Sequence, residues 1–191
     1  MTPIRLSEIL DLGDYERARG ELRARAIAAR GARRVAIGPA ATLAFENRET
    51  VRYQIQEMLR AERIATPDQV AHEIATYNEL LPGPAELSAT LMLEFPDEAE
   101  RARRLAELVG LERHLRLEVA STRVAARFDL RQLDPDRVSA VQFVRFPLFD
   151  ALLALRRGEP VRAIIDHPKY THSATLPAAV VAGLRSDLEQ A

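Results

Sequence analysis

The stretch LSATLMLEF at residues 87–95 alternates strictly between two sets of side chains, and this alternation limits the possible folds more than any other feature of the chain. Successive side chains of a β-strand point to opposite faces, so a period of two residues predicts a strand with one buried face. The predicted core-facing set is Leu87, Ala89, Leu91, Leu93 and Phe95, and the opposite set is Ser88, Thr90, Met92 and Glu94. Such a strand belongs in a sheet whose apolar face is covered by other elements.

Helical and strand patterns along the rest of the chain predict an α+β fold. Capping residues and helical spacing of apolar residues predict helices over 14–30, 47–63, 66–81, 97–110, 147–159 and 177–191. Alternating or apolar runs predict strands within 33–46, 114–119, 123–128, 138–146, 161–166 and 172–176. We therefore expect a single domain over residues 1–191, helical at 1–82 and strand-rich at 87–191, with helices packed on a mostly antiparallel sheet.

The composition excludes several classes of function. The chain has no cysteine, which rules out disulfides, a thiol nucleophile, a thiolate-bound iron–sulfur cluster and any cysteine zinc site. Its 27 basic and 28 acidic residues give a formal net charge of -1, so we do not expect nucleic-acid binding. No run approaches the roughly 18 apolar residues that a spanning helix needs, and the first residues do not form a secretion signal. We expect a soluble cytoplasmic protein with no membrane partner.

Motifs of the common enzyme classes are missing. His72 and Glu73 begin like the helix of a zinc protease, but Thr76 occupies the position of the second histidine. The chain has no Gly-x-Ser-x-Gly nucleophile elbow and no glycine-rich phosphate loop before a helix. The sequence therefore leaves open whether the protein is an enzyme.

The strongest local signal for a site is a pair of histidines in the predicted hairpin VRAIIDHPKYTHSATL, residues 161–176. If Pro168–Thr171 form a four-residue loop, His167 lies directly opposite His172 on the apolar face of the hairpin. Two imidazoles so placed can share a divalent metal such as iron, zinc or manganese, with carboxylate or water ligands from another element. The alternative is that both are core histidines, hydrogen-bonded to the backbone or to Tyr170, itself a candidate for binding a cofactor.

The polar stretch FENRETVRYQIQEML, residues 45–59, predicts an amphipathic helix that Asn47 caps and that extends to about Arg63. On a helical wheel, the core stripe comprises Val51, Ile55, Met58 and Leu59. Gln54 flanks this stripe and Glu62 falls inside it, so both would need buried partners. We expect Gln54 and Glu62 to be the ligand- or cofactor-binding candidates of this helix, and its other polar residues to face solvent.

Four segments carry a resemblance to a known family: DYERAR at 14–19, FENRETVRYQIQEMLRAERI at 45–64, LMLEFPDEAERARRLAEL at 91–108 and DHPKYTHSATLP at 166–177. They resemble an uncharacterised bacterial family, a domain of unknown function of about this chain length, over nearly the whole chain. The resemblance implies genes that often stand near those for rubrerythrin and for a heterodisulfide-reductase-like iron–sulfur protein. It therefore implies a role in peroxide handling or electron transfer.

Two functions are compatible with these observations. The first is a metal- or small-ligand-binding accessory protein of a cytoplasmic redox or peroxide-handling system. The second is a non-catalytic structural or interaction protein that docks an iron–sulfur or rubrerythrin-type partner through a sheet edge or its first helix. Seven arginines stand against one acid, Glu21, between Arg17 and Arg34, which suits an acidic partner, although a solvated helix face is the simpler interpretation.

Overall fold

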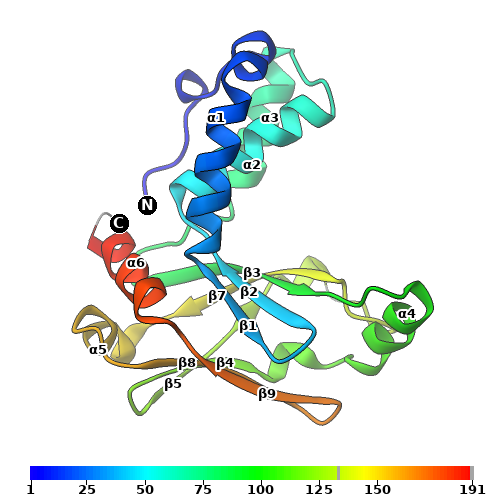
Figure 1. Ribbon diagram of the computed structural model, residues 1–191, viewed down its shortest axis with the longest axis vertical. Helices are drawn as coiled ribbons and strands as arrows, with labels where there is room; N and C mark the ends of the chain where they lie inside the picture. Colours follow the sequence, from blue (N-terminus) through cyan, green and yellow to red (C-terminus); the bar gives the residue numbers. More distant parts are fainter. Residues whose placement is uncertain (133, 190–191) are drawn as a thin grey trace.

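The computed structural model describes residues 1–132 and 134–189, whose strands form two antiparallel sheets (Figure 1). Sheet A has, in spatial order, β1 (Arg34–Ile37), β2 (Ala41–Phe45), β3 (Glu86–Leu93), β7 (Val141–Pro147) and β6 (Arg127–Phe128). Sheet B has β5 (Thr122–Ala125), β4 (Leu115–Val119), β8 (Val161–His167) and β9 (Tyr170–Thr175). Tight turns at 38–40, 120–121 and 168–169 join β1 to β2, β4 to β5 and β8 to β9, and such hairpins require antiparallel pairing.

The main hydrophobic core lies between the two sheets. Leu91 of sheet A and Leu117 and Ile165 of sheet B are fully buried there. The core also takes apolar residues from α4 (Glu98–Glu107), α5 (Leu152–Arg156) and α6 (Ala178–Glu189), which pack around the edges of the sheets. This arrangement confirms the predicted α+β class.

The remaining helices form a second unit of structure that stands away from the sheets, which we call the helical lobe (Figure 1). It consists of α1 (Leu12–Gly31), α2 (Arg48–Ala61) and α3 (Pro67–Asn78). A separate, smaller core holds it together, made of Ile4, Val51, Ile55, Leu59, Val70, Ile74 and Leu81. The predicted stripe of α2 thus faces this core, except that Met58 is only half-buried. Among the described residues, no helix is both long enough and apolar enough to cross a membrane.

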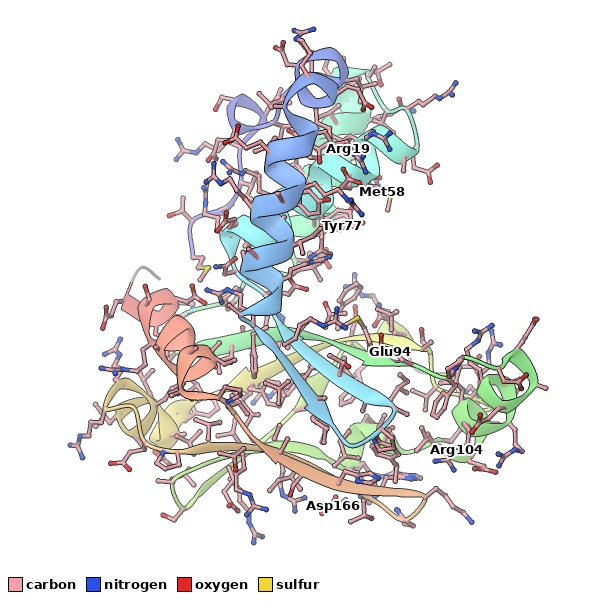
Figure 2. All side chains as sticks on the ribbon, viewed as in Figure 1. Arg19, Met58, Tyr77, Glu94, Arg104 and Asp166 are labelled. Carbon is pink, nitrogen blue, oxygen red and sulfur yellow. The ribbon has the colours of Figure 1, made fainter. Side chains whose placement is uncertain are left out.

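Polar contacts fasten α1 to α2, because α1 buries only Tyr15 and Ala26. The guanidinium of Arg19 donates two hydrogen bonds to Glu57, at 2.8 and 2.9 Å, and the hydroxyl of Tyr15 donates a third at 2.7 Å. These contacts lower the pKa of Glu57, chiefly through Arg19. Figure 2 shows Arg19 on the side of α1 that faces the other helices of the lobe. The interface is therefore an ion-paired one.

Two details, in α2 and β3, differ from the predictions. Gln56 of α2 is buried and not solvated, because its side-chain amide bonds both the N–H and the C=O of Leu10. Ser88 and Thr90, on the predicted polar face of β3, are buried as well. The last helix was predicted to reach Ala191; it extends over Ala178–Glu189, and residues 190–191 lie outside the described part.

Candidate functional site

The hairpin of β8 and β9 has a different register from the predicted one. Its turn consists of residues 168–169 alone, so His167 pairs with Tyr170 and Ile165 pairs with His172. The prediction that the two histidines lie directly opposite each other is therefore wrong. They lie diagonally across the hairpin on one face, and His167 is buried whereas His172 is exposed.

Both ring nitrogens of His167 are engaged by the backbone. Its Nδ1 accepts a hydrogen bond from the N–H of Lys169 at 3.2 Å, and its Nε2 lies 3.2 Å from the carbonyl oxygen of Val109. The first contact needs a lone pair on Nδ1 and the second needs a proton on Nε2, so the two contacts together fit the tautomer with its N–H on Nε2. A metal at His167 would have to displace one of these bonds. In the described part of the chain, no group of three or more His, Asp or Glu residues is arranged to hold a metal ion.

Tyr170 joins the two sheets. Its buried hydroxyl accepts hydrogen bonds from the N–H groups of Ala40 and Ala41, each at 3.0 Å, and donates one to the carbonyl oxygen of Ile37 at 2.6 Å. One donor and two acceptor positions are all that a phenol offers, so this hydroxyl is fully occupied within the protein. Burial raises its pKa. The contacts of Tyr170 are those of a structural residue that fixes the β1–β2 turn on sheet B.

Gln54 has the buried partner that its position on α2 demands. Its side-chain amide donates to the carboxylate of Glu46 at 3.0 Å. Glu46, which follows β2 directly, is 4% exposed and accepts two more hydrogen bonds, from the hydroxyl of Thr50 and from that of Thr90 at 2.6 Å. All three donors are neutral, and Glu46 has no ion pair within the described residues. We call Glu46, Thr50, Gln54 and Thr90 the Glu46 cluster.

The Glu46 cluster holds a carboxylate away from water. Moving a carboxylate out of water carries a large free-energy penalty, and buried carboxylates are normally paired with a cation. In the Glu46 cluster, three neutral hydrogen-bond donors take the place of a cation among the described residues. Because the cluster also ties α2 to β2 and β3, it fixes the position of the helical lobe over sheet A.

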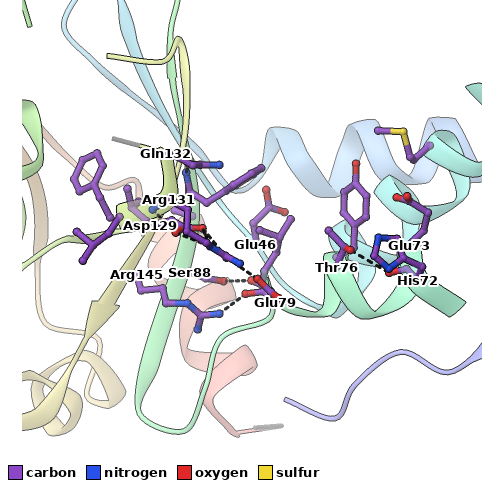
Figure 3. Close-up of a pocket in the computed structure, with 18 of the residues that line it drawn as sticks. Glu46, His72, Glu73, Thr76, Glu79, Ser88, Asp129, Arg131, Gln132 and Arg145 are labelled. Carbon is purple, nitrogen blue, oxygen red and sulfur yellow. Dashed lines mark hydrogen bonds and ion pairs between the residues drawn. The ribbon is translucent and has the colours of Figure 1, made fainter. Parts of the chain in front are cut away.

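Glu46 lies in the wall of a large open cleft of about 1520 Å³ between the helical lobe and sheet A. Figure 3 shows Glu46 and Ser88 between the two walls, with His72, Glu73 and Thr76 of α3 on one side and Asp129 and Arg131 on the other. Apolar side chains from both walls also line the cleft: Met58, Ile64, Tyr77, Leu80, Ala89, Phe128, Leu130, Phe143 and Val144. The cleft thus has a mixed lining, in which these nine apolar side chains stand among thirteen polar or charged ones.

One end of the cleft is closed by arginines. Arg131 bonds Asp129 on its own wall and, at 2.7 Å, the carboxylate of Glu79 from the helical lobe. Arg145 of β7 donates to the carbonyl oxygen of Glu79 (Figure 3) and also to the carboxylate of Glu86. The contacts of Arg131 lower the pKa of Asp129, so this end stays ion-paired at neutral pH. The open side of the cleft carries Glu62 and Glu73, which have no ion pair among the described residues.

Glu62 is part of this cleft, but it does not lie on the buried face of α2. The helix ends at Ala61, so Glu62 is the C-cap and its side chain is exposed. The prediction that it lies inside the core stripe is wrong, because the helical wheel treated position 62 as part of the helix, which ends at Ala61. Neither His167 nor His172 lines the cleft, so the structure does not bring the histidine pair and the two α2 candidates together.

The burial of Glu46 did not follow from any sequence pattern. Glu46 directly follows the strand-forming run of β2 and precedes the cap Asn47, so neither helical nor strand periodicity applies to it. The one usable signal was the polar position Thr90 in β3, whose hydroxyl would need a partner if the helical lobe covered that face.

Comparisons with known proteins agree with this fold and assign no activity. A family model described as "Protein of unknown function (DUF3501)" matches residues 3–188. Among solved structures, the chain is similar to a novel protein of unknown function from Burkholderia pseudomallei K96243, with 37% sequence identity and a TM-score of 0.91. That alignment covers 98% of this chain and 100% of the other. No curated protein matches the chain.

Proposed function

The chain belongs to the DUF3501 family, whose function is unknown, and on that premise we propose that it is a small-ligand-binding accessory protein of a redox or peroxide-handling system. The observation that carries this proposal is the buried carboxylate of Glu46, held by neutral donors in the wall of the cleft between the helical lobe and sheet A. The redox setting rests on the gene neighbourhood that the family resemblance implies.

The lining of the cleft indicates the kind of ligand. Its volume of about 1520 Å³ exceeds the roughly 300–1,000 Å³ usual for small-molecule pockets, so a bound molecule is large or fills only part of it. Tyr77, Phe128 and Phe143 line the cleft with aromatic surface, and the carboxylates of Glu62 and Glu73, which have no ion pair among the described residues, can accept hydrogen bonds from a ligand. We propose a ligand with an apolar, ring-containing body and several hydrogen-bond donors.

A ligand site is better supported than a metal site at the histidine pair. The backbone uses both nitrogens of His167, and His172 is not its cross-strand partner. Because the chain has no cysteine, a thiol or a thiolate-bound redox group is excluded, and a redox-active group would be a non-thiolate metal, part of the ligand or part of a partner protein.

Native mass spectrometry of the protein purified from its own cells tests this proposal. Thr76 is exposed and lines the cleft, so Thr76→Trp fills space there, whereas Ala75→Trp adds the same side chain to an exposed neighbouring position outside the cleft. We expect a non-covalently bound small molecule on the wild type and on Ala75→Trp, and none on Thr76→Trp. A ligand that stays bound to Thr76→Trp, or none on any of the three, contradicts the proposal.

The outer face of α1 favours a second function, the docking of an acidic iron–sulfur or rubrerythrin-type partner. Ile27 is 56% exposed, and Arg23 and Arg30, on the same side of the helix, have no ion pair within the described residues. Arg19 is not part of this face, because it holds α1 on α2 through Glu57.

Charge reversal distinguishes this function from ligand binding. Arg23→Glu with Arg30→Glu is expected to abolish co-purification of such a partner, since docking relies on charge complementarity. Arg156→Glu with Arg157→Glu is the matched control, because these arginines on or next to α5 are exposed and equally unpaired among the described residues. Equal co-purification with both double variants would remove α1 as the docking face.

A further inference from the structure

A second cavity, of about 830 Å³, lies where the N-terminal segment meets the helical lobe and α6. Figure 1 shows the chain starting close to the end of α6 and running from there alongside α1 of the helical lobe. The cavity's described lining shares no residue with the cleft at Glu46. Five arginines line it, against three carboxylates: Arg5, Arg25, Arg33, Arg48 and Arg52 against Glu8, Glu49 and Asp187.

Two of these arginines are neutralised within the protein. Arg33 forms a bidentate ion pair with Asp187, and both side chains are largely buried. Arg48 binds the carboxylate of Glu8 and the carbonyl oxygen of Thr2. These pairs also account for two of the three carboxylates, so they leave Glu49 as the one acid of the described lining without an ion pair.

The other three arginines converge on the cavity from separate elements. Arg5 comes from the N-terminal segment, Arg25 from α1 and Arg52 from α2. None of their guanidinium groups has an ion pair or a hydrogen bond among the residues that the structure describes. Like charges from three elements repel one another, and an anion between them relieves that repulsion. Guanidinium groups also suit phosphate and carboxylate, because their N–H donors match two oxygens at once.

The backbone that positions these arginines is fixed before any ligand arrives. Ile4 exchanges two hydrogen bonds with the side chain of Asn78, at 2.9 and 3.0 Å, so Arg5 starts from an anchored main chain. Gln56 anchors Leu10 in the same way. A preorganised site loses less conformational entropy when a ligand binds to it.

An adjoining pocket of about 160 Å³ suggests what the anion is attached to. Four of its lining residues, Arg25 and Arg52 among them, also line the second cavity. Its other side chains are mainly apolar or aromatic: Leu10, Tyr15, Leu22, Ala26, Tyr53 and Gln56. A volume of this size accepts a small ring next to the charged group.

We propose that this second cavity binds a small phosphate ester, with its phosphate held by Arg5, Arg25 and Arg52 and its apolar group in the adjoining pocket. The inference does not depend on the function proposed for the cleft, since the two cavities have separate linings.

Isothermal titration with phenyl phosphate, at constant ionic strength, tests the site on the full chain. We expect binding that weakens by about tenfold or more in Arg25→Gln and in Arg52→Gln, because each removes a charge-assisted contact. Arg23→Gln is the control, since Arg23 lies two residues from Arg25 on α1 but outside both pockets. None of these three guanidinium groups makes a described ion pair, so the variants are expected to keep the wild-type melting temperature.

Two further probes locate the two halves of the site. Inorganic phosphate is expected to bind more weakly than phenyl phosphate, because it leaves the apolar pocket empty, and benzoate tests whether a carboxylate can replace the phosphate. The proposal is overturned if phenyl phosphate does not bind, if its affinity is the same in Arg25→Gln, Arg52→Gln and Arg23→Gln, or if benzoate binds and phenyl phosphate does not.

Discussion

Gln54 donates a hydrogen bond of 3.0 Å to the buried carboxylate of Glu46, and this contact places a polar side chain beside the apolar stripe of α2. The same carboxylate binds Thr90 of β3, so one acidic group connects the helical lobe with sheet A. The cleft that we propose as the ligand site is open between these two parts of the molecule.

Removing the Glu46 side chain is expected to destabilise the protein. Glu46→Ala leaves the hydroxyls of Thr50 and Thr90 and the amide of Gln54 without their acceptor, so the free energy of unfolding should fall by about 2–4 kcal/mol. Equilibrium unfolding in guanidinium chloride measures this loss. Glu94→Ala is the control, because Glu94 also accepts a threonine hydrogen bond but is exposed, and its effect should stay within about 0.5 kcal/mol. If the free energy of unfolding falls equally in both variants, the Glu46 cluster does not hold the helical lobe on sheet A.

Tyr170→Phe is expected to loosen the contact between sheet B and the β1–β2 turn. The change removes a hydroxyl that bonds three backbone groups, and it leaves the N–H of Ala40 without this acceptor, whereas Ile37 and Ala41 also pair with each other in the β1–β2 ladder. Each unpaired buried group has a cost, so the free energy of unfolding should fall by about 1–3 kcal/mol. Tyr53→Phe, whose hydroxyl makes no hydrogen bond among the described residues, should change it by less than about 0.5 kcal/mol. Equilibrium unfolding in guanidinium chloride compares Tyr170→Phe and Tyr53→Phe with the wild type.

Much of the fold followed from local pattern, because alternation and capping are properties of neighbouring residues. The strand β3 and the cap at Asn47 are both present in the structure. Burial of Thr90 on the other face of β3 did not follow, since it depends on where the helical lobe lies. The register of His167 was also missed, because a two-residue turn and a four-residue turn suit the same sequence.

The ion pair of Glu57 with Arg19 should make stability depend on pH below the ordinary glutamate range. The pKa of Glu57 is lowered in the folded protein, so its contribution is fully present above the ordinary value of 4.5 and is lost as pH falls through the lower folded value. We expect the stability difference between the wild type and Glu57→Gln to be constant from pH 6 to 8 and to shrink below pH 4.5. Urea unfolding at a series of pH values measures it, and a constant difference down to pH 3 would contradict the assignment.

His167→Ala is expected to lower stability without changing metal content. The variant loses the ring bonds to Lys169 and Val109 and opens a cavity beside His114, so its melting temperature should fall. Elemental analysis of protein purified without a histidine tag should give the same iron, zinc and manganese content as in the wild type. If the wild type contains stoichiometric metal and His167→Ala and His172→Ala lose it, this prediction is contradicted and a metal site at the histidine pair is supported.

Hydrogen exchange with a dialysed low-mass extract of the producing cells tests the cleft most directly. The account predicts slower exchange in the segments that form both walls, residues 58–64, 72–80 and 127–132, in the wild type and in Ala75→Trp but not in Thr76→Trp. No change in these segments, or a change that persists in Thr76→Trp, would contradict the claim that a small molecule binds between the helical lobe and sheet A.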